Sequence, residues 1–406
     1  MAVGLTTPDN LLAIDGIRLG VAAAGIRYSD RNDLLLVEIE TGSSSAAVFT
    51  KNAFCAAPVV VCREHLASAA PRFLVINSGN ANAGLGKAGL LASNECCRAV
   101  AKLADCQPEA VLPFSTGVIG ESFPTQTLVD ALPVAQQDLS TDNWLAAAKA
   151  IMTTDTVAKG YSEQITLDGK TITITGIAKG SGMIRPDMAT MLAYIATDAD
   201  VSDAVLDTCL RRAVDNSFNR ITVDGDTSTN DACVLIATGK AGNKSITEAD
   251  SAEAEILFDV VLKLSQKLSE SIIRDAEGVT RLMTIVVEQG ADADECDAVA
   301  YTVAHSPLVK TALFAGDPNW GRILAAVGRA GLPDLDVEKI AIYLDDVCIV
   351  HNGGRDEAYT EAAGQAVMQQ ETITVTVKLG RGDATTTVQT SDLSYDYVRI
   401  NAEYRS

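Results

Sequence analysis

The stretch IAKGSGMIRPDMATMLAYIATDAD, residues 177–200, joins two segments of opposite character. Its first half contains Gly180, Gly182 and Pro186, which favour an irregular loop over a helix or a strand. From Thr190 onward, TMLAYIAT has six apolar residues in eight and no polar face, which is typical of a strand buried on both sides. Thr190 therefore lies where an accessible loop enters a rigid strand. Threonine also begins many ordinary strands, so position alone does not give this residue a function.

The segment KGSGMIRPDMATMLAYIATDA resembles the self-processing region of the ornithine acetyltransferase (glutamate N-acetyltransferase) family. Members of that family cut their precursor at an Ala-Thr bond, here between Ala189 and Thr190, and use the freed threonine as nucleophile. The blocks FTKNAFCAAPV, NSGNANA and LVKTALFAGDPNWGRILAAVGRAG also resemble the family, so the resemblance extends along the chain. It implies an alpha chain of residues 1–189 and a beta chain of residues 190–406.

The composition of the chain limits the classes of partner that we expect the protein to bind. The chain has 406 residues, 47% of them hydrophobic, which is enough for a large core. A formal net charge of −21 argues against nucleic acid and anionic membranes, because proteins approach both through an excess of Lys and Arg. The N-terminus lacks the pattern of a signal peptide, and no run of about 18 apolar residues predicts a transmembrane helix. We therefore expect a cytoplasmic protein.

Cysteine and histidine usage favours neither disulfides nor a metal. The nine cysteines form no C-x-x-C pair, which is typical of free thiols. None of the three histidines, His65, His305 and His351, lies in a recognisable nucleophile motif. The acidic run DGDTSTND departs from a calcium loop, because Thr229 and Leu235 stand where Gly and Glu are required. We expect no metal site and no bound cofactor.

Predicted strands and helices alternate in short runs, which favours a layered α/β or α+β fold. DLLLVEIE predicts a strand over residues 33–40, and TLDGKTITITG predicts a hairpin turned at Asp168 and Gly169. Residues 202–218 have the pattern of an amphipathic helix. The resemblance implies a β-sheet core flanked by helices, similar to N-terminal-nucleophile hydrolases and autoprocessed into two chains.

Candidate site residues come from local pattern and from the resemblance. AVLPFSTGVIGE places Thr116 and Gly117 after a short apolar run, where a hydroxyl and a backbone N–H could serve as oxyanion donors. A plain turn has the same pattern. The resemblance implies that Thr116 and Gly117 hold the oxyanion. It also implies that the substrates are bound by Thr153, Lys179, Thr190, Glu277, Asn401 and Ser406. From charge, we infer that Lys179 binds a carboxylate and Glu277 an ammonium group.

An N-terminal threonine explains catalysis without histidine. An alcohol needs a base to become a good nucleophile, and cleavage before Thr190 would free an α-amine with a pKa of about 7.7–8.0. The resemblance implies ping-pong transfer of acetyl from N2-acetylornithine, through Thr190, to glutamate in the cyclic route to arginine. We expect the two chains to associate as a heterotetramer of two alpha and two beta chains.

The sequence leaves three points open. The sequence does not decide whether acetyl-CoA is a second donor, used as a co-substrate. An N-terminal-nucleophile amidohydrolase or aminopeptidase would make the same cut but pass the acyl group to water. A non-catalytic amino-acid-binding protein would make no cut at all.

Overall fold

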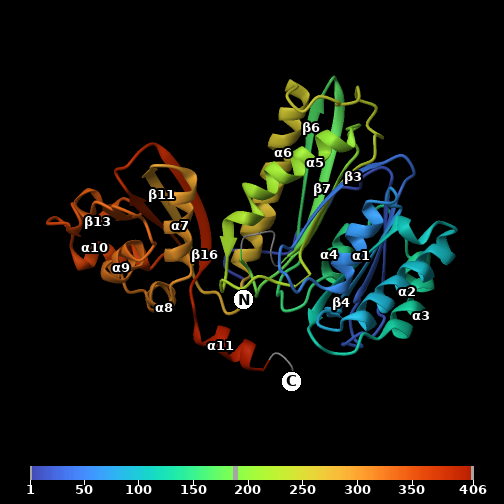
Figure 1. Cartoon of the computed structure of the whole chain (residues 1–406), viewed down its shortest axis with the longest axis horizontal. Helices are drawn as coiled ribbons and strands as arrows, with labels where there is room; N and C mark the ends of the chain where they lie inside the picture. The colour runs from blue at the N-terminus through green and yellow to red at the C-terminus, as the bar shows by residue number, and fades with distance from the viewer. Residues whose placement is uncertain (1, 186–190, 404–406) are drawn as a thin grey trace. The chain divides into compact units, whose positions relative to one another are not determined.

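The computed structural model describes residues 2–185 and 191–403, which divide into two compact units (Figure 1). The larger unit contains residues 6–219 and 226–272, in the parts that are described. The smaller unit contains the described parts of residues 1–5, 220–225 and 273–406. The bond between Ala189 and Thr190 lies outside the described residues, within the range of the larger unit. The two units are therefore not the two predicted chains.

The larger unit is built on two sheets. Among its described residues, the four-stranded sheet has the order β1 (Ile17–Ala22), β2 (Leu34–Ile39), β4 (Phe73–Asn80) and β5 (Val111–Val118). The five-stranded sheet has the order β3 (Ser44–Phe49), β10 (Ala232–Ala237), β8 (Leu192–Thr197), β7 (Lys170–Lys179) and β6 (Lys159–Leu167). The helices are α1 (Ala57–Leu66), α2 (Lys87–Ala104), α3 (Thr125–Gln137), α4 (Trp144–Ala150), α5 (Asp203–Asp215) and α6 (Ala252–Arg274).

Alternation along the strands gives each sheet two apolar faces. On β2, Leu35 and Val37 belong to a core shared with β8 and β10 of the other sheet. Leu34 and Leu36 alternate with them and pack against α2 and α3. On β7, Ile177 joins the shared core, whereas a Cβ on its neighbour Gly176 would meet Leu264 and Leu268 of α6. The unit thus has a helix–sheet–sheet–helix layering, and the predicted sheet core flanked by helices is confirmed (Figure 1).

The smaller unit has one mixed sheet. Its order among the described residues is β14 (Gly354–Arg355), β13 (Val347–His351), β12 (Ala341–Leu344), β15 (Thr372–Lys378), β11 (Leu282–Gly290), β16 (Ala384–Ser391) and β9 (Ile221–Thr222). The helices are α7 (Ala293–Ala304), α8 (Pro307–Ala315), α9 (Trp320–Gly328), α10 (Glu361–Met368) and α11 (Tyr395–Ala402). Residues of α7, α8 and α9 share a buried apolar cluster with β11, β12 and β15.

Local predictions are confirmed where the sequence pattern is strong. The predicted strand over residues 33–40 is β2, and the helix predicted over residues 202–218 is α5. The hairpin of β6 and β7 turns at Asp168 and Gly169, which both have a positive φ.

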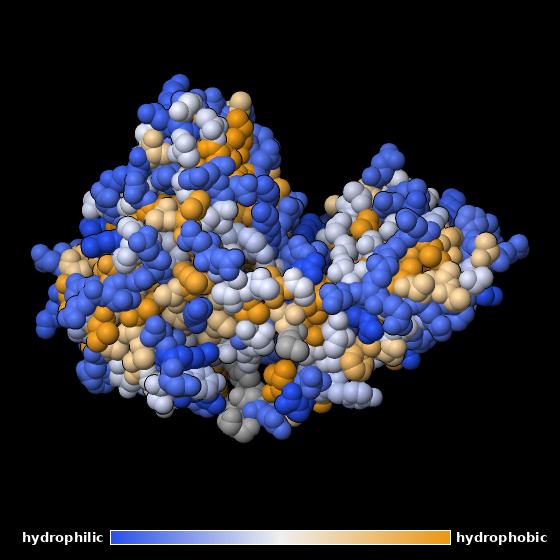
Figure 2. Space-filling view, turned by 180° about the vertical axis from the view of Figure 1, so that it is seen from behind, coloured by the Kyte–Doolittle hydropathy of each residue, from blue (hydrophilic) through white to orange (hydrophobic). Residues whose placement is uncertain are grey.

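The surface and the cysteines complete the description of the fold. Figure 2 shows hydrophilic residues over much of the visible face, with smaller hydrophobic areas between them. No helix in the described parts of the chain is long and apolar enough to cross a membrane. All nine cysteines are free thiols.

Candidate active site

Thr116 and Gly117 lie near the end of β5, beside the end of its parallel neighbour β4. In the register of these strands, Thr116 is opposite Ser78 and Gly117 is opposite Gly79, where the pairing becomes irregular. Gly117 has φ 133°, and a Cβ there would collide with the backbone of Gly79. Only glycine fits where these two strands approach each other so closely. The backbone therefore requires the glycine after Thr116 at the point where the two strands end.

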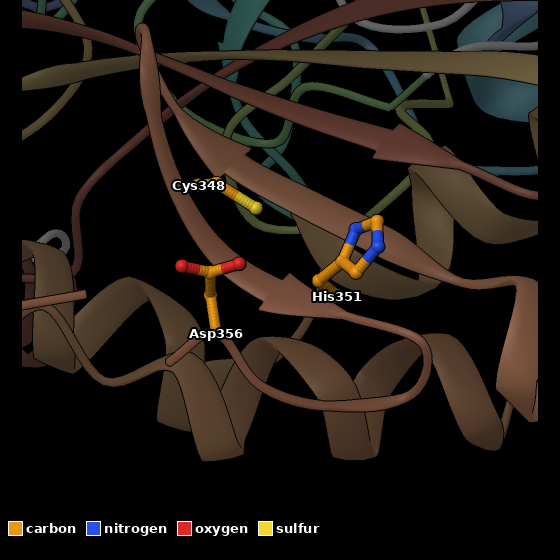
Figure 3. Close-up of side chains that lie close together, drawn as sticks. All are labelled: Cys348, His351 and Asp356. Atoms are coloured by element: carbon orange, nitrogen blue, oxygen red, sulfur yellow. The ribbon is translucent and has the colours of Figure 1, made fainter. Parts of the chain in front are cut away.

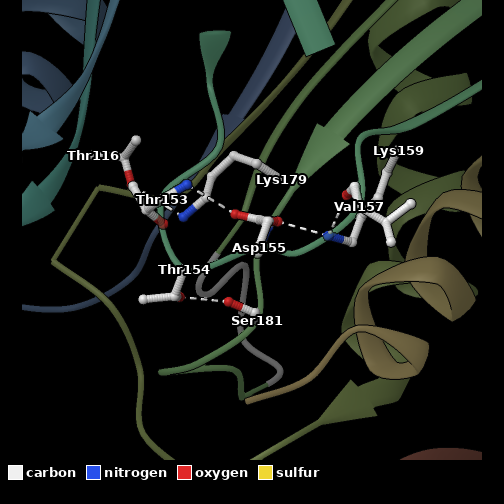
Figure 4. Close-up of polar contacts among 9 residues, drawn as sticks. Thr116, Thr153, Thr154, Asp155, Val157, Lys159, Lys179 and Ser181 are labelled. Carbon is white, nitrogen blue, oxygen red and sulfur yellow. Dashed lines mark hydrogen bonds and ion pairs between the residues drawn. The ribbon is translucent and has the colours of Figure 1, made fainter. Parts of the chain in front are cut away.

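Thr116 is hydrogen-bonded to Lys179, the last residue of β7. The Lys179 Nζ donates to Thr116 Oγ1 at 3.1 Å, and both residues are only 8% exposed (Figure 4). An ammonium group can only donate, so the Thr116 oxygen is the acceptor in this bond. Its own O–H stays available to donate to another group. The two residues come from different sheets of the larger unit, and the fold of that unit brings them together.

A buried ion pair lies next to these residues. Asp155 Oδ1 accepts hydrogen bonds from Lys159 Nζ and from the Gly180 backbone N–H, both at 2.7 Å. Asp155 Oδ2 accepts one from the Thr153 N–H at 3.0 Å. The side chains of Asp155 and Lys159 are both 0% exposed (Figure 4). The Asp155 carboxylate thus connects three segments: the residues that follow α4, the first residue of β6, and Gly180, which follows β7.

The charge state of this pair follows from its surroundings. Burial alone would raise the pKa of the Asp155 carboxyl. The positive charges of Lys159 and Lys179, with the hydrogen bonds, outweigh burial and hold that pKa well below its ordinary range. Lys159 Nζ makes a second hydrogen bond to the Val157 carbonyl at 3.2 Å. Asp155 is therefore ionised at neutral pH.

Neighbouring hydroxyl and amide groups hold the loops of the site. Thr154 Oγ1 and Ser181 Oγ are 2.6 Å apart, which links the segment after α4 to the segment after β7 (Figure 4). Asn230 Nδ2 donates to the carbonyl oxygens of Ala81 and Ser115, at 2.6 and 2.9 Å. The polar run DGDTSTND therefore includes a residue that supports the end of β5.

The other predicted binding residues lie on the smaller unit. Asn401 Nδ2 donates to Glu277 Oε2 at 2.8 Å, so these two predicted residues are brought together. Glu277 is 7% exposed and is not an ordinary surface glutamate. Gly278 has φ 69°, and a Cβ there would collide with the backbone N of Tyr397. This close packing of α11 against the loop places Asn401 beside Glu277.

The structure places part of the predicted site and leaves part outside its description. Thr116, Gly117, Thr153 and Lys179 gather on the larger unit, and Glu277 and Asn401 on the smaller unit. Ala189, Thr190 and Ser406 lie outside the described residues. Sequence reasoning missed Asp155, Lys159 and Asn230, because their contacts depend on tertiary packing.

Comparison with known proteins identifies the family. A sequence profile of the ArgJ family matches residues 18–406. The chain belongs to the ArgJ family. It is 54% identical over 406 residues to the arginine biosynthesis bifunctional protein ArgJ of Pseudomonas syringae pv. tomato, covering 100% of both chains. It is 56% identical to the protein of the same name from Methylococcus capsulatus, covering 98% of this chain and 97% of the relative.

Two solved structures match part of this chain. The arginine biosynthesis bifunctional protein ArgJ of Bacillus halodurans is 34% identical, with a TM-score of 0.48, and the match covers 50% of this chain and 95% of that one. The ornithine acetyltransferase of Mycobacterium tuberculosis, solved with ornithine, is 33% identical with a TM-score of 0.38. That match covers 44% of this chain and 94% of the solved chain.

Proposed function

We propose that the protein is an acetyltransferase of arginine biosynthesis that moves acetyl from N2-acetylornithine to glutamate through an ester on Thr190. Identity of 53–56% along nearly the whole chain, to relatives named for arginine biosynthesis, supports this assignment. The structural observation that carries the chemistry is the Lys179–Thr116 hydrogen bond. It leaves the Thr116 hydroxyl hydrogen free to point at an oxyanion, next to the N–H of Gly117.

The position of Thr190 in the sequence suits this arrangement. Thr190 comes two residues before Leu192, and Leu192 is the residue of β8 that pairs with Lys179. Thr190 is therefore only two residues along the chain from the strand position beside Lys179, which is hydrogen-bonded to Thr116. A positive charge at Lys179 also polarises the Thr116 hydroxyl and makes it a stronger donor to a developing negative charge.

The acetyl transfer then has two halves. The Thr190 oxygen attacks the acetyl carbonyl, its proton passes to the Thr190 α-amine, and Thr116 and Gly117 stabilise the oxyanion. The amide C–N bond breaks, the nitrogen takes the proton, and ornithine leaves an acetyl ester on Thr190. In the second half the glutamate amine attacks the ester, and N-acetylglutamate leaves as the Thr190 hydroxyl re-forms.

Self-processing uses the Thr190 hydroxyl and the same oxyanion donors, but not the α-amine, which is part of the peptide bond until the cut. The Thr190 hydroxyl attacks the Ala189 carbonyl and the peptide C–N bond breaks, so the acyl group moves to the hydroxyl oxygen as an ester and the Thr190 amine is released. Water then hydrolyses this ester, which gives the Ala189 carboxylate and restores the Thr190 hydroxyl. Asp155 positions this reaction, because it holds the backbone N–H of Gly180 at the beginning of the loop. We assign the carboxylate groups of the amino-acid substrates to Lys179 and their ammonium groups to Glu277. We propose that the substrates also contact the remaining predicted residues, Thr153, Thr190, Asn401 and Ser406.

One assay tests the function. Purified protein is supplied with labelled N2-acetylornithine, with and without glutamate, and acetylglutamate and acetate are quantified. Acetylglutamate formation that depends on glutamate supports the transferase. Acetate release at one rate with or without glutamate would instead show the amidohydrolase, and an uncut, inactive 42.6 kDa chain would show a binding protein. The same assay with acetyl-CoA decides whether it is a second donor.

The assembly is tested separately. We propose that two alpha and two beta chains form the active particle. Light scattering after gel filtration measures its mass, and denaturing mass spectrometry shows whether each particle contains both chains. A particle of one alpha and one beta chain would disprove the heterotetramer and leave the acetyl transfer untouched.

A further inference from the structure

A group of three potential metal ligands lies on the smaller unit, among residues that the acetyl transfer does not use. Cys348, His351 and Asp356 each offer one ligand atom: a thiol sulfur, a ring nitrogen and a carboxylate oxygen. These atoms all lie within 4.8 Å of one another. Figure 3 shows the three side chains on the same side of the β13–β14 hairpin. The sequence does not predict this group, because residues three apart on a regular strand face opposite sides.

A β-bulge brings Cys348 and His351 to one face. Ile342 of β12 pairs with Val350, but the next residue, Tyr343, pairs with Cys348. Strand β13 therefore has one extra residue at this point. As a result, the consecutive residues Ile349 and Val350 are both fully buried. Cys348 and His351, on either side of them, return to the outer face together.

Backbone contacts fix the positions of the other ligands. His351 precedes the two-residue turn of Asn352 and Gly353, whose φ angles of 49° and 72° are typical of a tight hairpin. The Asp356 N–H donates to the Ile349 carbonyl at 3.2 Å. Asp356 Oδ1 also accepts the Ala358 N–H at 2.9 Å, which restrains its carboxylate. All three side chains therefore start from restrained backbone positions.

The ligand types select the class of metal. A thiolate, an imidazole and a carboxylate are ligands of Zn²⁺, which takes them at about 2.0–2.3 Å in tetrahedral geometry. Ca²⁺ and Mg²⁺ prefer oxygen ligands and do not suit a thiolate. Three protein ligands with a half-exposed Cys348 and an exposed His351 leave a fourth position for water.

The Asp356 carboxylate lies close to the Cys348 thiol. Burial, and then the negative charge of Asp356, raise the pKa of the Cys348 thiol. A divalent cation between the two groups would compensate both negative charges and displace the thiol proton.

We propose that Cys348, His351 and Asp356 bind one Zn²⁺-class ion, with water as the fourth ligand. The ion would connect β13 to the segment that follows β14, at the edge of the sheet. The proposal concerns a site distinct from the residues assigned to acetyl transfer and does not depend on that function.

Co²⁺ titration of the full-length protein, purified without a polyhistidine tag, tests the site. Co²⁺ replaces Zn²⁺ in such sites and shows visible ligand-field bands and a thiolate-to-metal charge-transfer band in the near ultraviolet. We expect both bands, saturating at one ion per 406-residue precursor equivalent and displaced by Zn²⁺. Each bound ion should release about one proton from Cys348 near pH 7.

Matched variants identify the ligands. Cys348→Ser should abolish the charge-transfer band, and His351→Ala or Asp356→Asn should weaken binding by at least about 100-fold, more than the loss of an outer-shell partner costs. Cys55→Ser, at another partly exposed free thiol, should change nothing. The proposal is overturned if no charge-transfer band develops, or if Cys348→Ser retains the band that Cys55→Ser loses.

Discussion

Removing the charge of Asp155 should destabilise the larger unit and slow self-processing. Asp155 accepts three hydrogen bonds, two on Oδ1 and one on Oδ2. In Asp155→Asn one of these oxygens becomes an NH₂ group. Whichever way the amide turns, it presents a donor either to the Thr153 N–H or to both Lys159 and Gly180. At least one buried donor then loses its partner, and the ammonium of Lys159 loses its counter-charge.

The size of the effect follows from burial. Breaking one partner of a buried ion pair costs about 3–5 kcal/mol, because the remaining charge stays out of water. The Asp155–Lys159 pair is 0% exposed on both sides, so solvent does not screen it. A surface pair is worth only about 0–1 kcal/mol. Arg98→Met, at a pair in which both side chains are 55% exposed, is therefore the matched control.

Urea unfolding and a cleavage time course give the two readouts. Asp155→Asn and Lys159→Met should each lower the free energy of unfolding by about 3–5 kcal/mol, and Arg98→Met by less than about 1 kcal/mol. The double variant Asp155→Asn/Lys159→Met should lose less than the sum of the two. Cleavage, followed by mass spectrometry well below the unfolding temperature, should be slower in Asp155→Asn. The reasoning is refuted if both single variants resemble Arg98→Met in stability and cleave at the wild-type rate.

Acid gives an independent check on the same carboxylate. The pKa of Asp155 is lower in the folded protein than its unfolded value of about 3.9. Its contribution to stability is therefore fully present above about pH 4 and is lost as the pH falls toward the folded pKa. The stability difference between the wild type and Asp155→Asn should shrink below about pH 4. A difference that stays constant down to pH 3 would show that the ionised carboxylate is not its cause.

Three further outcomes are expected. Thr190→Ala should remain one uncut chain without transferase activity, whereas Thr190→Ser should still be cut. If the alanine variant gave two fragments, one ending at residue 189 and one starting at residue 190, self-processing would be contradicted. Thr116→Val, which keeps the side-chain volume but not the hydroxyl, should slow processing and transfer about 10²–10³-fold, and wild-type kcat would contradict its oxyanion role. Burial lowers the pKa of Lys310 to about 8. The unfolded lysine keeps its proton up to about pH 10.4, so the folded state loses the proton at a lower pH than the unfolded state. The free energy of unfolding of the wild type, measured in urea, should therefore rise by up to about 3 kcal/mol relative to Lys310→Met between pH 7 and 10. A constant difference over that range would contradict the burial of a charged lysine.

Strong local patterns predicted much of the fold. The apolar run in DLLLVEIE predicted β2, and Asp168-Gly169 predicted the turn of the β6–β7 hairpin. The local pattern of Thr116-Gly117 fits a plain turn equally well, so the pair was singled out by the family resemblance, and its oxyanion role stays a prediction. The strand and hairpin predictions succeeded because the physical cause of each is contained within a few consecutive residues.

Features that depend on distant segments could not be predicted. Asp155 and Lys159 are four residues apart but lie after the end of α4 and at the start of β6, so no helix places them together. Lysine is rarely buried without a partner, and its sequence neighbours do not reveal the partner. Strict alternation would place Cys348 and His351 on opposite faces of β13, and the bulge places them on the same face. Both cases require knowledge of which strand lies alongside which.

The sheet order explains how a cut chain can remain one folded unit. The predicted cut falls between β7 and β8, which are antiparallel neighbours with Lys179 opposite Leu192. Two residues suffice for a tight turn between such strands, whereas residues 180–191 separate these two in the sequence. The long connection is therefore not needed to bring the strands together.

The two predicted chains also interleave within one sheet. Strand β8 of the beta chain lies between β7 of the alpha chain and β10, and β10 pairs in turn with β3 of the alpha chain. Breaking the bond before Thr190 removes none of these backbone hydrogen bonds. Because β8 stays paired along both edges, the new N-terminus begins two residues before a strand that cannot leave without opening the sheet. A nucleophile created by cleavage is in this way held by the fold that existed before the cut.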